Sequence, residues 1–203
     1  MKSEDRRPYR MTSRAEAANA TAERILDAVT ELFWERPTDQ VVLRDVAERA
    51  GVTVQTVLRK YAGKEALLAA AADRAMSRTE AERAVSPGDL DTAIEVLLDH
   101  YEELGPKVLR LLAEEHSSPM LAEFAERGRV LHRQWCSTVF AETLEPLTGV
   151  ARKRRLAQVV AVCDVYTWKL LRLDSGLSRR QTQIALHELL GPLLTTASPD
   201  EVP

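Results

Sequence analysis

The stretch LRDVAERAGVTVQTVLRKYAGKEALL, residues 43–68, contains Gly51, the first glycine of the chain. A glycine at the end of a helix adopts the left-handed conformation at little cost, and Thr53 is a good N-cap for a second helix. Val57 and Tyr61 lie four residues apart on that second helix and can face inward together. Apolar residues before the glycine recur at helical spacing: Leu43, Val46, Ala47 and Ala50. The stretch therefore predicts two short helices joined by a tight turn, a helix-turn-helix.

The charge around this motif favours a DNA-binding role without establishing it. Residues 1–78 hold 14 Lys and Arg against 12 Asp and Glu, whereas the remainder holds 14 against 19. An N-terminal part that faces DNA is expected to be the more basic one. An ordinary helical hairpin without a nucleic-acid partner fits the same local pattern, so both interpretations stay open at this point.

The composition of the 203 residues indicates a helical protein with a sizeable core. Apolar residues make up 45% of the chain, aromatic residues only 5%, and alanine and leucine are abundant. The sequence contains no run of 18 apolar residues, so no membrane span is predicted. The first 20 residues do not resemble a secretory signal, so we expect a cytoplasmic protein. Cys136 and Cys163 lie in apolar helical segments and are expected to be core thiols rather than a disulfide.

Glycine and proline divide the rest of the chain into further helices. Pro87-Gly88, Gly105-Pro106 and Ser118-Pro119 each predict a break between two helices. The helices are expected over residues 21–36, 64–84, 89–104, 107–115, 120–147, 151–174 and 179–194, in addition to the two of the motif. No strand pattern appears, so the sequence predicts an all-α fold of about nine helices.

The motif is similar to that of the tetracycline-repressor (TetR) family of bacterial transcription regulators. The resemblance rests on the A-x-x-x-G-V-T turn and on the aromatic-x-x-K-E-x-L-L run from Tyr61 to Leu68. It implies a three-helix DNA-binding domain over residues 17–66, after a flexible basic arm at residues 1–16. It also implies a ligand-binding and dimerisation domain over residues 67–197, before a disordered tail at residues 198–203.

The resemblance also implies which residues approach DNA. Val54, Gln55 and Leu58 would face base edges in the major groove, and Arg44 would reach a base. Gln and Arg can each form two hydrogen bonds to a base, to adenine and to guanine respectively. The residues expected near the phosphates are Thr53, Thr56, Arg59, Lys60 and Lys64.

Three positions depart from the usual pattern of the family. Many members carry Tyr where this chain has Leu58, and we favour packing of Leu58 into the core of the motif over contact with DNA. Val54 is apolar where polar residues are frequent, and contact with thymine methyl groups and burial both fit it. Val42 stands where a capping Thr is often found, so one phosphate contact is expected to be missing.

The family resemblance implies a homodimer formed by the last two helices. An intramolecular core fits the same apolar residues, and the sequence does not decide between them. The residues expected at the dimer interface are Leu156, Val160, Cys163, Thr167, Leu170, Leu171, Ile184, His187, Leu190 and Leu194.

The resemblance further implies a small-molecule pocket among the middle helices. The candidate lining residues, each of which also fits a plain core position, are Tyr101, Leu104, Leu112, Trp135, Val139 and Tyr166. The expected effector is small and mostly apolar. The four histidines are not at metal-ligand spacing, and no cofactor is expected.

The function expected from these observations is a repressor that binds a palindromic operator as a dimer and is released by the effector. Two other classes remain: a helical enzyme and a protein–protein interaction module. The glycines do not form a nucleophile elbow, a phosphate-binding loop or a dinucleotide-binding turn, so no catalytic residue is predicted. Turnover of a substrate would favour the enzyme, and absent or salt-insensitive DNA binding would favour the interaction module.

Overall fold

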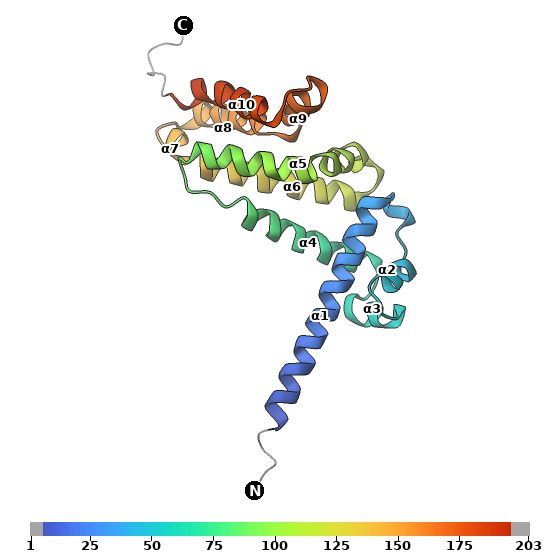
Figure 1. Cartoon of the computed structure of the whole chain (residues 1–203). Coiled ribbons are helices and arrows are strands. Elements are labelled where there is room, and N and C mark those ends of the chain that lie inside the picture. Colours follow the sequence, from blue (N-terminus) through green and yellow to red (C-terminus); the bar gives the residue numbers. More distant parts are fainter. Residues whose placement is uncertain (1–5, 196–203) are drawn as a thin grey trace. The chain divides into compact units, whose positions relative to one another are not determined.

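The computed structural model describes residues 6–195, with side chains from residue 16 onward. This part of the chain contains helices and no strand (Figure 1), so the all-α prediction is confirmed. The residues form two compact units, and the boundary along the chain lies between Ala75 and Met76. Each unit has its own interior and is described by itself.

The N-terminal unit packs three helices and the first part of a fourth around an apolar interior (Figure 1). Its core comes from α1, from the motif helices and from the first turns of α4, and it includes Ile25, Val29, Leu32, Val46, Val57 and Leu67. The elements are α1 (Arg6–Glu35), η1 (Thr38–Gln40), α2 (Leu43–Arg49), α3 (Val54–Tyr61) and α4 (Lys64–Glu82).

The turn between α2 and α3 has the geometry that the sequence predicts. Gly51 has a φ of 65°, in the left-handed region, and the Val52 N–H donates to the carbonyl of Ala47 at 2.9 Å. Ala47 and Val57 are 3% and 0% exposed, so the small residue and the apolar one fill the angle between the helices. Local backbone hydrogen bonds and the buried side chains of Ala47 and Val57 therefore hold the two helices of the motif together.

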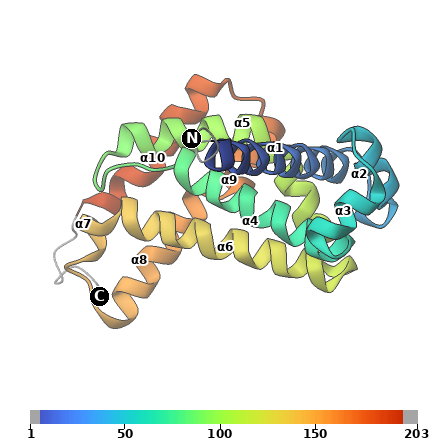
Figure 2. The same cartoon turned by 90° about the horizontal axis from the view of Figure 1, so that it is seen from below.

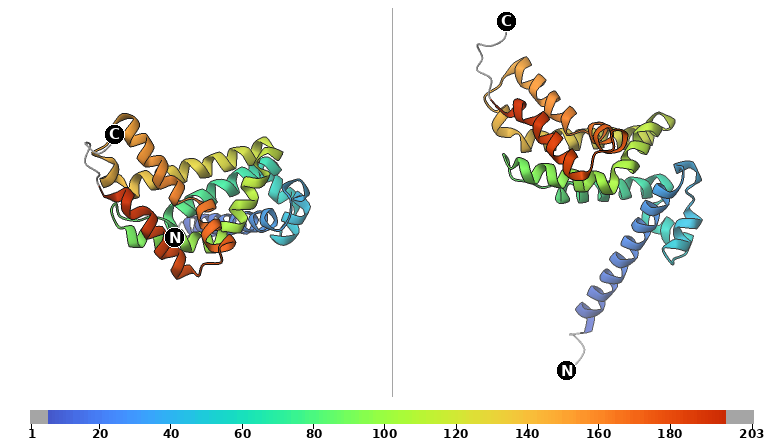
Figure 3. Two further views of the ribbon diagram at one scale, coloured as in Figure 1. Left: turned by 90° about the horizontal axis from the view of Figure 1, so that it is seen from above. Right: turned by 45° about the horizontal axis from the view of Figure 1, so that its top comes forward.

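The C-terminal unit is a bundle built on α5 and α6, with the last helices packed beside them (Figure 2). α8 and α10 lie side by side in both views of Figure 3. After the end of α4, the elements are α5 (Leu90–Glu114), η2 (Glu115–Ser117), α6 (Pro119–Val139), α7 (Ala141–Leu144), α8 (Gly149–Val162), α9 (Val165–Lys169), the π-helical turn η3 (Leu170–Asp174) and α10 (Arg179–Leu194).

The N-terminus differs from the expected flexible arm. α1 begins at Arg6, so residues 6–16 are helical, where the sequence predicted no helix. Pro8 falls in the first turn of the helix, where its missing N–H breaks no bond, and the alanine-rich residues 15–20 favour helix. Residues 1–5 and the tail expected at 198–203 lie outside the described residues. α4 runs through residue 66, in agreement with the helix expected over residues 64–84, and the first compact unit ends within it at Ala75.

The expected break at Gly105-Pro106 does not occur, because α5 continues through both residues. Gly105 is buried, and a Cβ added to it would lie 2.5 Å from the Trp168 ring. The glycine therefore serves the close approach of α9 to α5 rather than a helix end. The missing N–H of Pro106 removes one bond of the helix, which the packing of α5 on its neighbours outweighs.

Two long helices predicted from the sequence are shorter in the structure. The segment 120–147 is divided at Phe140 into α6 and α7, and the segment 151–174 is divided at Cys163 and Asp164 into α8 and α9. Asp164 caps α9, since its carboxylate accepts the N–H of Tyr166 at 2.9 Å. Thr53 caps α3, as predicted, and Ser118 and Ser178 cap α6 and α10.

Candidate DNA-binding surface and effector pocket

Most of the residues that the sequence assigned to DNA lie on the surface of α3. Thr53, Gln55, Arg59 and Lys60 are exposed, and Val54 and Thr56 are partly exposed. Thr53 caps the helix, because its hydroxyl accepts the N–H of Thr56 at 3.2 Å. A recognition helix requires such a free face next to a well-formed N-terminus.

The favoured prediction that Leu58 packs into the core of the motif is wrong. Its side chain is 38% exposed, whereas its neighbour Val57 is fully buried. The inward direction of α3 is taken by Val57, so the next residue along the helix points away from the core. Leu58 therefore presents an apolar contact surface beside Gln55 and Arg59.

The basic residues of this surface differ in how they are held. Arg59 makes no hydrogen bond or ion pair with any residue from 16 to 195. The Arg44 side chain is 84% exposed and lies 3.6 Å from a carboxylate oxygen of Asp45. Lys60 donates to the carbonyl of Ala18 at 2.9 Å. Arg59 and Arg44 are thus the basic side chains most available to a polyanion.

Lys64 has a partner within the protein. Its ammonium donates to the carbonyl of Thr38 at 2.6 Å and lies 3.5 Å from the carbonyl of Asp39. These bonds connect the start of α4 to η1. A phosphate at this place is therefore expected to meet the free N–H groups of the first turn of α4, which attract anions at any helix N-terminus.

The start of α2 lacks a side-chain cap, as the sequence predicted. Val42 is the N-cap residue, has extended backbone angles and offers no oxygen to the first N–H groups of the helix. At the other end of the motif, Ala62 closes α3 with a φ of 57°. Among the residues that the structure describes, Ala62 is the only one other than glycine with a positive φ.

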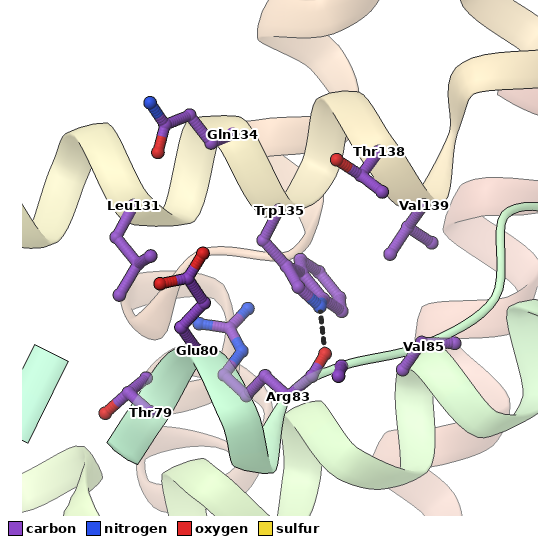
Figure 4. A pocket seen from close by; sticks show the side chains of 10 residues that line it. Thr79, Glu80, Arg83, Val85, Leu131, Gln134, Trp135, Thr138 and Val139 are labelled. Carbon is purple, nitrogen blue, oxygen red and sulfur yellow. Dashed lines mark hydrogen bonds between the residues drawn. The ribbon is translucent and has the colours of Figure 1, made fainter. Parts of the chain in front are cut away.

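The C-terminal unit contains a pocket of about 250 Å³ between the end of α4 and one face of α6 (Figure 4). Its apolar wall comes mainly from Leu131, Trp135 and Val139 on α6 and from Val85. Its polar lining residues are Thr79, Glu80, Arg83, Gln134 and Thr138. A small apolar molecule with one polar group fits such a lining.

Two of the six predicted lining residues, Trp135 and Val139, lie at this pocket. Tyr101 is instead a core residue, whose hydroxyl donates to the carbonyl of Cys163 at 3.0 Å and whose pKa is raised by burial. Tyr166 is 52% exposed on α9. Leu104 and Leu112 are partly buried and do not line the pocket. These four residues do not line this pocket, because sequence spacing does not show which helix faces meet.

Arg83, which the sequence analysis did not identify, is the most unusual residue of the pocket. It follows the last residue of α4 and is only 5% exposed. Its guanidinium lies over the Trp135 ring, 4.2 Å from the ring centre, and the Trp135 indole N–H donates to the Arg83 carbonyl at 2.7 Å (Figure 4). A lone arginine at a helix end usually projects into water, so no local pattern indicates this burial.

Hydrogen bonds around His132 connect Arg83 to the interior. Arg83 Nη2 lies 3.3 Å from His132 Nδ1, and His132 Nε2 lies 3.3 Å from the carbonyl of Val160. Because the carbonyl can only accept, these bonds assign the His132 proton to Nε2. Burial lowers the pKa of Arg83.

The two cysteines are free and buried, as predicted. Cys136 lies on α6, with its sulfur 3.7 Å from His132 Nε2. Cys163, at the end of α8, is 1% exposed and belongs to the core of the unit.

The predicted dimer residues divide into exposed and buried groups. Leu170 and Ile184 are 58% and 47% exposed. Leu190 and Cys163 are buried within their own unit, and their contact with a partner stays a prediction. The other predicted residues are partly buried: Leu156, Val160, Thr167, Leu171, His187 and Leu194. Three further apolar residues on the same elements are exposed: Tyr166, Leu173 and Leu189.

The N-terminal unit carries the decisive match to a known family. Residues 25–71 match the family described as "Bacterial regulatory proteins, tetR family". The chain belongs to the TetR family. It is therefore a helix-turn-helix transcription regulator, and the match covers α2 and α3 entirely.

Solved structures show the same fold over most of the chain. A transcriptional regulator from Rhodococcus sp. Rha1 is 23% identical, with a TM-score of 0.62 over 90% of this chain and 99% of that one. A SmeT–triclosan complex is 18% identical, with a TM-score of 0.63 over 91% and 99%. GusR of Salmonella enterica is 18% identical, with a TM-score of 0.59 over 84% and 95%. No curated protein sequence matches the chain.

Two other kinds of site are absent from the described residues. No helix between residues 6 and 195 is long and apolar enough to cross a membrane. His, Cys, Asp and Glu side chains in this part of the chain do not gather in groups of three or more that could hold a metal ion.

Proposed function

We propose that this TetR-family regulator is a repressor without catalytic activity, which binds a palindromic operator as a homodimer through α3. We further propose that a small, mostly apolar effector binds in the C-terminal unit and releases the operator. The observation that carries the proposal is the free face of α3, where Gln55, Leu58 and Arg59 are exposed within a matched family motif.

The salt dependence of DNA binding tests the phosphate contacts. Two basic residues expected near the phosphates (Arg59 and Lys60) in each of two protomers give about four contacts, so the log-log slope of affinity against salt is about −4. Arg59→Ala weakens binding to all sequences alike and reduces the slope, whereas Lys153→Ala on α8 leaves both unchanged. The probe is the DNA upstream of the chain's own gene, with footprinting and titration. A slope near zero contradicts DNA binding through these residues.

Base reading is assigned to Gln55 and Arg44, whose exposed side chains can each form two bonds to a base edge. Gln55→Ala and Arg44→Ala are expected to relax the preference at particular base pairs, at about 1–3 kcal/mol each. Selection of binding sites from a random DNA pool measures this preference. Variants that lose affinity equally for all sites contradict the assignment.

The dimer is assigned to the exposed apolar residues of α9, η3 and α10. Tyr166, Leu170 and Leu173 recur at three- to four-residue spacing, and Ile184 and Leu189 are exposed on α10. Leu170→Glu places a charge on this surface without disturbing the interior, and is expected to produce monomers in sedimentation. A wild-type chain that is monomeric at micromolar concentration contradicts the proposal.

The effector is assigned to the pocket beside α6, and SmeT, a structure with the same fold, is known in complex with triclosan. α4 carries Lys64 in its first turn and the pocket residues Thr79 and Glu80 near its end. An effector that lowers operator affinity must bind free protein more tightly than DNA-bound protein by the same factor.

A pocket-filling variant tests this assignment. Thr138 lines the pocket and is exposed, so Thr138→Trp fills the space without disturbing the core. It is expected to bind the operator normally and to be insensitive to effector. Val130→Trp, at an exposed α6 position away from the pocket, remains sensitive. Equal effector affinity for free and DNA-bound protein contradicts the mechanism of release.

A further inference from the structure

We propose that the pocket beside Arg83 binds a small monocarboxylate with an apolar body, and that the Arg83 guanidinium anchors its carboxylate. The inference deepens the proposed function, because it specifies the chemical class of the effector. Only its regulatory consequence rests on that function, since the binding itself is a property of the free protein.

Arg83 carries a buried positive charge without a counterion in the described part of the chain. It is 5% exposed, and no Asp or Glu from residue 16 to 195 lies within 4.0 Å of its guanidinium. Buried charges in proteins are paired or bound to a ligand, because removing a charge from water is strongly unfavourable. An anion at this place would complete the pair.

The hydrogen-bonding state of Arg83 also indicates a site for an anion. One guanidinium nitrogen, Nη2, lies within bonding distance of His132, while Nε is buried and has no acceptor. Nη1 also donates to no residue among those described. A guanidinium presents its N–H groups as a planar fork that a carboxylate matches with two parallel bonds.

Neighbouring residues keep this arginine in the pocket rather than in solvent. The Trp135 ring lies under the guanidinium at 4.2 Å, and the Trp135 N–H holds the Arg83 backbone at 2.7 Å. Figure 4 shows the Arg83 side chain among the pocket residues, with the indole beside it. The fork is therefore fixed before any ligand arrives, which lowers the entropy lost on binding.

Glu80 carries the carboxylate that lines the pocket, and it is the alternative partner for the Arg83 guanidinium. It is an exposed residue near the end of α4, and it forms no ion pair with Arg83. An exposed carboxylate keeps its hydration, so it does not replace a ligand that binds the guanidinium. Its negative charge is instead expected to oppose a second anion and to restrict the site to ligands with a single carboxylate.

The size and walls of the pocket define the rest of the ligand. A volume of about 250 Å³ is below the usual range for drug-sized molecules, which is about 300–1,000 Å³. Leu131, Val139 and the Trp135 ring offer an apolar wall for a short chain or a single ring. Benzoate, phenylacetate and hexanoate are suitable probes, and their amides are matched neutral controls.

Calorimetric titration of the full-length free protein with these six compounds tests the proposal. At least one acid is expected to bind at least ten-fold more tightly than its amide. Arg83→Met removes this preference, because the apolar side chain fills similar space without the charge. Arg133→Met, which removes an exposed arginine from α6, keeps it. Glu80→Gln is expected to strengthen binding of the acid.

The outcomes separate the ligand class from the regulatory role. If no acid binds, or if acids and amides bind equally to the wild-type protein, the proposal is wrong even should Arg83→Met fail to fold. An unchanged preference in folded Arg83→Met also overturns it. An acid that binds but leaves operator affinity unchanged supports the ligand class and contradicts only its role as effector.

Discussion

The two units of the chain differ in what they bury. In the N-terminal unit, all the buried residues from residue 16 to Ala75 are apolar. The C-terminal unit buries the polar side chains of Arg83, His132 and Thr182, and the indole N–H of Trp168 has no hydrogen-bond partner there.

The arginines show the same difference. Arg36 and Arg74 of the N-terminal unit form surface ion pairs at 2.7–2.9 Å, with Asp45 and with Glu23 and Asp27 respectively. Arg83 of the C-terminal unit is buried beside a pocket and has no such partner among the described residues. The first unit is thus a closed scaffold with its chemistry on the outside, whereas the second holds its chemistry inside.

The largest effect is expected from the interior of the N-terminal unit. Leu32 is 1% exposed in its apolar core, so Leu32→Ala is expected to lower the free energy of unfolding by about 2–5 kcal/mol. Val42→Ala, at a 43% exposed position of the same unit, serves as the control. Urea unfolding followed by circular dichroism measures both. Similar small losses in the two variants would contradict a closely packed interior.

A pH effect should come from the C-terminal unit, which contains all four histidines. The pKa of His100 is lowered from 6.5 to about 4, because burial and then the charge of Arg83 disfavour the imidazolium. Between these values the unfolded chain binds a proton that the folded chain does not. The free energy of unfolding contributed by His100 therefore falls as the pH falls through this window, by about 3 kcal/mol in total.

Unfolding measured from pH 7 to pH 4 tests this dependence. His100→Gln is expected to remove part of the slope, whereas His116→Gln, whose parent side chain is 91% exposed, keeps it. Identical slopes in the wild type and both variants would show that His100 does not contribute.

Alanine substitutions at two glycines are expected to change the stability by smaller amounts and in opposite directions. Gly105→Ala places a Cβ 2.5 Å from the Trp168 ring and is expected to cost about 1–3 kcal/mol. Gly128→Ala, on the α6 helix with nothing within 4 Å, is expected to stabilise by about 0.5–1 kcal/mol. Thermal unfolding of the two variants separates a glycine needed for packing from one that only weakens its helix.

The smallest effect concerns the outer shell of the N-terminal unit. Val42→Thr supplies the missing cap of α2 and is expected to stabilise by about 1 kcal/mol. The variant also adds a hydroxyl next to the DNA-binding surface, so operator affinity is measured with the melting temperature. An unchanged melting temperature would show that water already satisfies the first turn of α2.

The N-terminal motif could be predicted from sequence because its determinants are local. Gly51, Thr53 and Val57 lie within seven residues, and each acts through its own backbone angle, cap or contact. The outward direction of Leu58 was missed, since one residue along a helix separates burial from exposure.

The C-terminal unit was harder to predict because its determinants are distant in sequence. The helix through Gly105 and Pro106 depends on Trp168, and the burial of Arg83 depends on Trp135 and His132. No periodicity within α4 or α5 contains that information. The pocket therefore appeared only once the faces of α4 and α6 were placed together.

The indole of Trp135 gives the pocket an optical label of its own. The chain has three tryptophans, and Trp135 lies under the Arg83 guanidinium and is bonded to the backbone of the same arginine. Indole emission responds to charge above the ring, so neutralisation of Arg83 by an anion changes the spectrum of this residue. Replacing Trp34 and Trp168 with Phe would leave a single emitter, and occupancy could then be followed in real time without a dye.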